Sequence, residues 1–280
     1  MKPIPRVVFT DGATVPALGL GSWRLGEHPA SASREIEALT VGLDLGMSLV
    51  DTAEMYGNGG SESLTGRVIA GRRDEVFLVS KVYPHNAGAR SAIAACERSL
   101  ARLDTDHLDL YLLHWRGSIP LSETVAAFER LRRDGKIVRW GVSNFDVDDM
   151  RELWALPEGR NCATNQVQYQ LAERGIEWDL LPWMRERGMP LMAYCPLGEG
   201  RLLDNRKLVR IATELHSAPA TVALAWLIRQ TGVIAIPASG RAAHVRANRA
   251  ATELALDDSA LAAIEAAFPS PAGASPLAIV

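Results

Sequence analysis

The sequence has 280 residues, 48% of them hydrophobic, and a formal net charge of −3 with a pI near 6.1. This length suits one large domain, and the hydrophobic fraction is sufficient for one well-buried core. No run of basic residues is longer than two, so nucleic acids and acidic membrane surfaces are not expected partners.

The chain starts with a predicted β-hairpin, in which the turn residues Asp11-Gly12 follow the apolar run Val7–Phe9. Short apolar segments then alternate with segments of helical spacing. The expected strands are Ala17–Gly21, Ser48–Asp51, Val76–Lys81, Leu108–His114, Val138–Ser143, Ala163–Val167, Leu191–Tyr194 and Val233–Pro237. Helical patterns between them include Ser33–Leu45, Ala89–Leu103 and Ser122–Arg133.

Eight strands that alternate with helices predict an α/β fold in which a parallel (β/α)₈ barrel fills a single domain, residues 1–280. Two consecutive helical patterns over Leu202–Thr231 and a further helix over Asp257–Phe268 are expected near the C-terminus. A doubly wound sheet is the alternative architecture. Neither a division into two halves nor a linker supports that alternative.

Polar residues mark the ends of successive predicted strands. They are Asp51, Lys81, His114, Asn144, Gln166 and Tyr194, separated by 22 to 33 residues. In a closed barrel the C-terminal strand ends converge on one mouth, where barrel enzymes place their chemistry. The sequence therefore predicts a single site at this mouth.

Four residues predict carbonyl reduction at this site: Asp51, Tyr56, Lys81 and His114. A phenol is a weak acid, and a neighbouring ammonium is expected to lower its pKa and make Tyr56 a better proton donor. Asp51 would hold Lys81 in place, and His114 would orient the substrate oxygen, on which negative charge develops. Each of these residues considered alone is more often structural.

Other chemistries find less support in the sequence. Three widely spaced cysteines, Cys96, Cys162 and Cys195, indicate neither a disulfide framework nor a zinc site. The six histidines show no metal-ligand pairing, and no GxSxG motif or GxGxxG fingerprint is present. No signal peptide or apolar run of membrane-spanning length is seen either, so we expect the protein in the cytoplasm. A monomer without a bound metal is also expected.

Seven segments together resemble the aldo-keto reductase superfamily, and bacterial reductases of methylglyoxal and other small aldehydes in particular. These segments are Gly19–Trp23, Asp51–Tyr56, Val79–Lys81, Leu110–Trp115, Gly141–Phe145, Asn165-Gln166 and Ala193–Leu197. The resemblance implies that Tyr56 is the general acid, with Lys81, Asp51 and His114 in the supporting roles described above.

The resemblance also implies a nicotinamide cofactor site. Ser143, Asn144 and Gln166 match the residues that bind the carboxamide, and Tyr194 matches the ring on which nicotinamide stacks. Pro196 and Leu197 continue this site along the matched segment. NADPH is the expected cofactor and a small aldehyde or ketone the expected substrate.

The sequence departs from the family where the 2′-phosphate and adenine bind. Family members usually carry Lys-Ser, an Arg six residues after that Lys, and then Glu-Asn. Ser239 and Asn248 are retained here, but the remaining family positions hold Ala238, His244 and Ala247. Either of two arginines, Arg241 or Arg246, could compensate, and NADH is expected as a second, less preferred cofactor.

The substrate pocket is expected to include Trp23, Tyr83 and Trp115, which flank the strand ends. Two other functions stay open from the residues. One is a Schiff-base aldolase that uses a barrel lysine, and the other is a cofactor-binding regulatory barrel without turnover.

Overall fold

The computed structural model describes all 280 residues and contains one sheet of eight parallel strands. Neighbouring strands in the sheet are also neighbours along the chain, from β3 to β10. The strands are β3 (Leu20–Gly21), β4 (Leu49–Asp51), β5 (Phe77–Val82), β6 (Leu108–Leu113), β7 (Ile137–Ser143), β8 (Cys162–Gln168), β9 (Leu191–Tyr194) and β10 (Val233–Ala235). Each one overlaps a strand that the sequence predicts.

The sheet closes on itself through the chain next to β3 and β10. Leu18 forms a parallel bridge with Ala235, and Gly21 forms one with Ala238. A Cβ atom at Gly21 would lie 2.8 Å from the carbonyl oxygen of Ile236, so this close approach requires glycine. The predicted (β/α)₈ barrel is confirmed.

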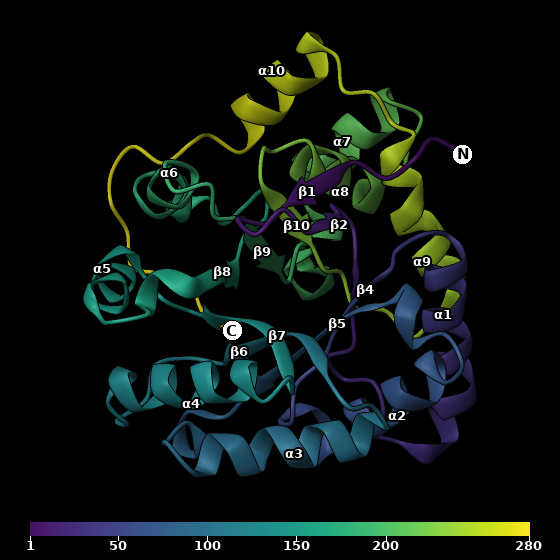
Figure 1. Cartoon of the computed structure of the whole chain (residues 1–280). Coiled ribbons are helices and arrows are strands. Elements are labelled where there is room, and N and C mark those ends of the chain that lie inside the picture. Colours follow the sequence, from purple (N-terminus) through teal and green to yellow (C-terminus); the bar gives the residue numbers. More distant parts are fainter.

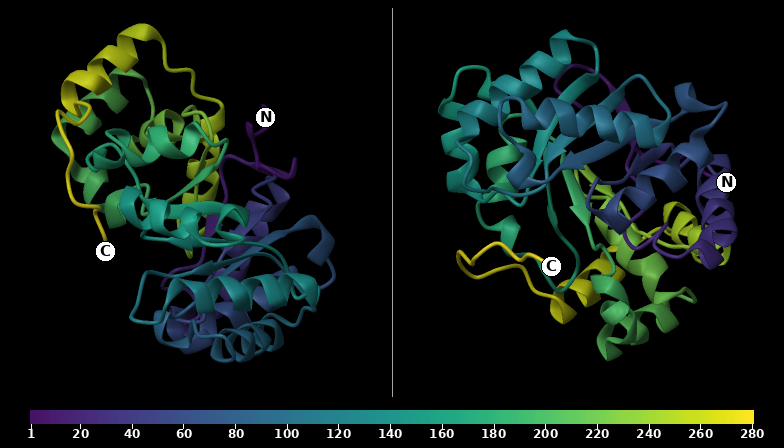
Figure 2. Two further views of the ribbon diagram at one scale, coloured as in Figure 1. Left: turned by 60° about the vertical axis from the view of Figure 1, so that its left-hand side comes forward. Right: turned by 90° about the horizontal axis from the view of Figure 1, so that it is seen from below.

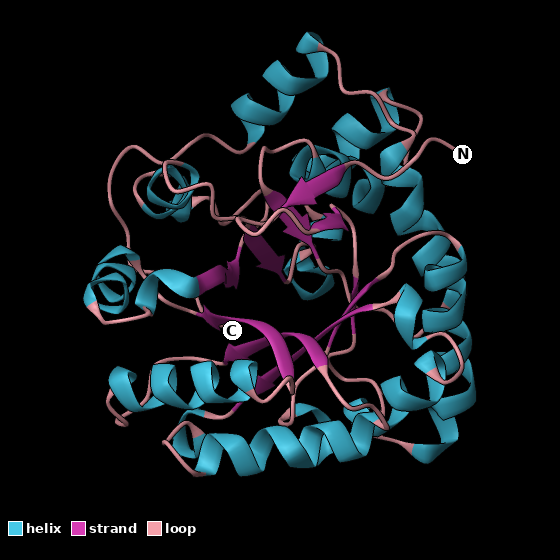
Figure 3. Cartoon of the chain, in the orientation of Figure 1, coloured by secondary structure: helices cyan, strands magenta, loops and turns pink.

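Helices cover the outside of the barrel, and the strands lie in the middle of the molecule (Figures 1 and 3). The helices are α1 (Ala32–Asp44), α2 (Gly60–Ile69), α3 (Ser91–Leu103), α4 (Leu121–Arg133), α5 (Val147–Ala155), α6 (Leu180–Arg185), α7 (Arg206–Glu214), α8 (Pro219–Ile228), α9 (Ala242–Arg249) and α10 (Asp258–Ala267). Among them, α7 and α8 are the two consecutive helices predicted before the last strand, and α10 packs against α7. The apolar helix α8 is buried because α7, α9 and β10 all pack against it.

The two ends of the chain add structure beyond the barrel. Strands β1 (Arg6–Val8) and β2 (Thr14–Pro16) pair antiparallel as the predicted hairpin. After α10 the chain runs as a long loop (Figure 2), and its residues Ile279 and Val280 reach the barrel cavity.

No single helix is both long and apolar enough to cross a membrane. Helices α7 and α8 meet these criteria only as a pair, and the two are bent by 87° relative to each other.

Candidate active site

A cavity of about 960 Å³ opens at the C-terminal ends of the barrel strands. Residues in the C-terminal part of seven of the eight strands, or just beyond them, line it: Gly21, Asp51, His114, Ser143, Gln166, Tyr194 and Ile236. They meet there because parallel strands of a barrel all point the same way. The predicted convergence of the strand ends on one mouth is confirmed.

The Lys81 ammonium lies behind the cavity wall and is fully buried. Its Nζ donates to Asp51 Oδ2 at 2.7 Å, to the carbonyl oxygen of Thr52 at 2.8 Å and to the Tyr56 hydroxyl at 3.2 Å. An ammonium has three N–H donors and no acceptor, so these contacts satisfy it completely. The Tyr56 oxygen therefore accepts from Lys81 and keeps its own hydrogen for another partner.

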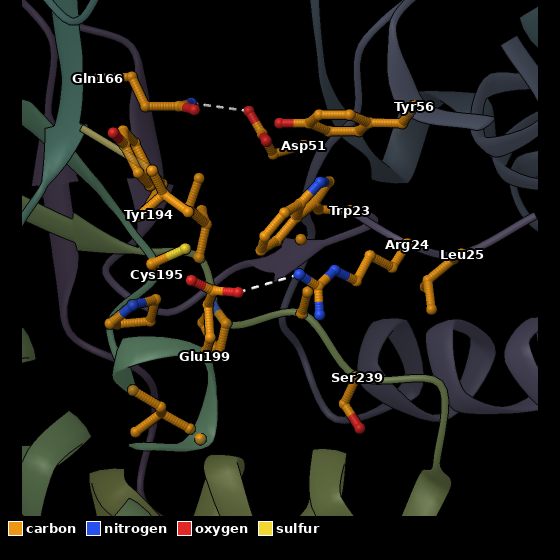
Figure 4. A pocket seen from close by; sticks show the side chains of 18 of the residues that line it. Trp23, Arg24, Leu25, Asp51, Tyr56, Gln166, Tyr194, Cys195, Glu199 and Ser239 are labelled. Carbon is orange, nitrogen blue, oxygen red and sulfur yellow. Dashed lines mark hydrogen bonds and ion pairs between the residues drawn. The ribbon is translucent and has the colours of Figure 1, made fainter. Parts of the chain in front are cut away.

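Tyr56 begins a short 3₁₀ turn between β4 and α2. The next two residues, Gly57 and Asn58, have left-handed backbone conformations with φ of 56° and 53°, so the chain turns sharply after Tyr56. This turn places the phenol in the cavity beside Asp51, which ends β4 (Figure 4).

Burial raises the pKa of Tyr56 well above its ordinary value, and the charges of Asp51 and Cys195 raise it further. The expected lowering of this pKa is therefore not found. Burial is the main cause of the rise, and the Asp51 carboxylate, which pairs with Lys81 at 2.7 Å, offsets the charge of the ammonium. The phenol stays protonated at neutral pH, as a proton donor must before it acts.

His114 lies beside Tyr56, with the two rings edge to face at 5.7 Å between centroids. Burial, assisted by the nearby Lys81 charge, lowers the pKa of His114 to about 2. The ring is therefore neutral at physiological pH and carries one N–H group. Its Nδ1 is buried without a partner, which leaves Nε2 as the nitrogen available to the cavity.

The predicted carboxamide-binding residues lie together in the middle of the mouth. The Gln166 amide donates to Asp51 Oδ1 at 2.8 Å (Figure 4), and the Ser143 hydroxyl donates to the Gln166 carbonyl at 2.7 Å. The Tyr194 hydroxyl donates to Asn144 Oδ1 at 2.8 Å. These contacts fix two amide side chains and an aromatic ring next to the Lys81–Asp51 pair.

Two of the three residues predicted for the substrate pocket line the cavity, Trp23 and Trp115. The third prediction needs correction, because Tyr83 does not line it. Tyr83 packs edge to face against Trp115 at 5.9 Å and stacks on His85 at 4.7 Å. It thus supports Trp115 from behind.

At the far end the cavity is lined by most of the residues predicted for the rest of the cofactor: Pro196, Leu197, Ser239, His244 and Asn248. Arg241 is the exception. It precedes α9 as its N-cap, its backbone N–H donates to the Ser239 hydroxyl, and its exposed side chain does not reach the cavity lining. The expected contact of Arg241 with this cavity is therefore not seen.

Several residues at the site were missed by sequence reasoning. Arg24 and Glu199 form an ion pair of 3.0 Å between two loops that line the cavity (Figure 4). Glu62, buried in the first turn of α2, accepts from Ser80 and Arg102 and so ties α2 to β5. The sequence offers no local signal for either contact because the partners are far apart along the chain.

Comparisons with known proteins agree with this geometry. The model of the Aldo/keto reductase family matches residues 17–268. The chain is 51% identical to methylglyoxal reductase YeaE of Escherichia coli, covering 98% of each chain, and 36% identical to glyoxal reductase of Bacillus subtilis, covering 83% and 82%. The crystal structure of an aldo/keto reductase from Klebsiella pneumoniae in complex with NADP and acetate has a TM-score of 0.96 and 49% identity, covering 99% of this chain and all of that one.

Proposed function

The chain belongs to the aldo/keto reductase family, and we propose that it reduces small aldehydes and ketones to alcohols with NADPH, using Tyr56 as the proton donor. The observation that carries the proposal is the Lys81 ammonium, which joins the Asp51 carboxylate and the Tyr56 hydroxyl at 2.7 and 3.2 Å. Such a group can hold a proton at the cavity and stabilise the phenolate that remains after transfer.

The residues in the cavity fit a nicotinamide cofactor. Amide and hydroxyl side chains beside an aromatic ring suit a ring that carries a carboxamide, and here Ser143, Asn144 and Gln166 lie near Tyr194. Pro196, Leu197, Ser239, His244 and Asn248 would hold the remainder of the molecule. When bound, NADPH supplies the hydride for the substrate carbon.

The protein groups then handle the substrate oxygen. The neutral His114 donates a hydrogen bond from Nε2 and orients the carbonyl, but with a pKa of about 2 it is no source of protons at neutral pH. Tyr56 transfers its proton to the oxygen as negative charge develops there. Lys81 stabilises the phenolate, and Asp51 keeps Lys81 charged and in position.

We propose 2-oxoaldehydes such as methylglyoxal as the substrate class. Two relatives support this choice by name, as a methylglyoxal reductase and a glyoxal reductase. Trp23 and Trp115 would contact the small substrate beside Tyr56. The three free cysteines suit a reducing compartment such as the cytoplasm.

The test is a panel of 2-oxoaldehydes, simple aldehydes, ketones and sugars, assayed with NADPH and with NADH by loss of the reduced-cofactor absorbance. We expect the highest kcat/KM for a 2-oxoaldehyde with NADPH. Absence of turnover with every carbonyl would overturn the proposal. Borohydride trapping of a substrate on Lys81 would instead point to Schiff-base chemistry.

A further inference from the structure

We propose that Arg34, in the first turn of α1, recognises the 2′-phosphate of NADPH and thereby sets the preference for NADPH over NADH. The inference rests on the function proposed above and names a residue that determines its cofactor specificity. NADPH differs from NADH only by this phosphate, which is a dianion near neutral pH. A cation that is free to contact this phosphate therefore favours NADPH over NADH.

The arginines that line the cavity do not meet this requirement. Arg24 pairs with Glu199 at 3.0 Å. Arg116 pairs with both Asp149 and Glu152 at 2.7 Å, and these contacts raise its pKa. A phosphate would have to compete with carboxylates for either guanidinium.

Arg34 has no carboxylate within ion-pair distance. Its one hydrogen bond to the protein runs from Nε to the carbonyl oxygen of Gly240, at 3.2 Å. Gly240 itself lines the cavity, next to Ser239. A guanidinium has five N–H donors, so this contact ties the Arg34 side chain to a residue of the cavity lining and leaves four donors available.

The first turn of α1, which carries Arg34, packs closely on the Ser239-Gly240 turn. A Cβ atom at Gly240 would lie 3.0 Å from Glu35 Cγ, which shows how closely the first turn of α1 approaches this turn. The buried carboxylate of the neighbouring Glu35 accepts from the backbone N–H of Gly26 at 2.9 Å and forms no ion pair with Arg34.

The Ser239 hydroxyl complements this cation. Its oxygen accepts from the backbone N–H of Arg241 at 3.2 Å, so its own hydrogen remains free to donate to a phosphate. A cation and a hydroxyl donor thus stand on the two sides of Gly240. Arg241 and Arg246 are exposed and, like Arg34, do not themselves line the cavity. Unlike Arg34, neither has a side-chain hydrogen bond to a residue that lines it.

The experiment isolates the phosphate with two cofactor fragments, adenosine 2′,5′-bisphosphate and adenosine 5′-monophosphate. Their Kd values are measured by calorimetry for the full chain and for Arg34→Gln. The matched control is Arg67→Gln, which changes an exposed helical arginine that has no ion pair. Circular dichroism confirms that the variants are folded.

We expect Arg34→Gln to weaken binding of the bisphosphate about tenfold or more, as for loss of a charge-assisted contact, and to leave the monophosphate unaffected. The Kd for NADPH should rise alongside, while that for NADH should not, and Arg67→Gln should change neither. Unchanged bisphosphate binding in Arg34→Gln would overturn the inference, as would an equal loss of monophosphate binding. The variants Arg241→Gln and Arg246→Gln are measured in the same way, and a loss of bisphosphate binding confined to either of them would also overturn it. Fragment binding does not depend on turnover, so it separates failure of this inference from failure of the proposed reaction.

Discussion

The two ends of the cavity are built in different ways. At the Tyr56 end the charged groups are buried, and the Lys81 ammonium has a partner for each of its three N–H groups. At the Ser239 end, the cations Arg34, Arg241 and Arg246 are exposed and none pairs with a carboxylate. A buried charge needs specific partners, whereas a surface cation can be supplied from several positions. The residues around Tyr56 therefore depend on one another, whereas the cation at the Ser239 end can be replaced by one from another position.

The largest effect that would test this contrast is on Tyr56. Tyr56→Phe removes the transferable proton while keeping the ring, so kcat should fall by about 10²- to 10⁴-fold. Cofactor affinity should change little, because the phenol lies at the reaction end. Steady-state kinetics and a binding titration with NADPH measure the two quantities. Near-normal kcat would show that Tyr56 is not the acid.

Lys81→Met tests the buried charge itself. The substitution leaves Asp51 buried without its cation, so we expect both a loss of turnover and a loss of about 3–5 kcal/mol in unfolding free energy. Denaturant unfolding measures the stability, and the double variant Lys81→Met/Asp51→Asn is the control. The double variant should recover much of the stability but not the rate. If a folded Lys81→Met protein keeps its rate, Lys81 is structural only.

The sequence predicted the reaction end well because of barrel geometry. Residues at strand ends converge, so Asp51, Lys81 and His114 could be found from their spacing. The same reasoning does not apply beyond the end of a strand. Because β5 ends at Val82 and Pro84 starts a 3₁₀ turn, the alternation of side chains along a strand could not predict which way Tyr83 faces.

The Ser239 end was less predictable because its groups come from distant parts of the chain. Arg34 and Gly240 are 206 residues apart and meet only through the packing of α1 against α9. Sequence reasoning considered Arg241 and Arg246 because they lie near Ser239 along the chain. The sequence also does not show how deeply a side chain is buried. For this reason the pKa of Tyr56 was expected to be lowered, whereas burial raises it.

A third test uses the acid sensitivity that burial gives to His114. In the unfolded chain a histidine binds a proton below a pH of about 6.5, whereas the folded protein resists protonation of His114 down to a pKa of about 2. Because the unfolded state binds more protons in this window, stability falls as the pH falls through it, by about 1.4 kcal/mol per unit. Acidification from pH 6.5 to 5 should therefore cost the protein about 2 kcal/mol more than it costs His114→Asn. Urea unfolding of both proteins at the two pH values measures this difference, and parallel losses would mean that His114 titrates normally.

The smallest expected effect concerns the ion pair between Arg24 and Glu199, which joins the two loops across the cavity. Arg24 is well exposed, so the pair should contribute no more than about 1 kcal/mol. Glu199→Gln should then speed NADPH release by at most about fivefold, and added salt should bring the unmodified protein toward the variant. Stopped-flow dissociation measures the rates, with Glu186→Gln as a control, since Glu186 pairs with Arg187 away from the cavity. A larger or salt-independent change would mean that Glu199 contacts the cofactor directly. The loop that carries Glu199 would then belong with the closely determined groups around Tyr56 rather than with the exposed groups around Ser239.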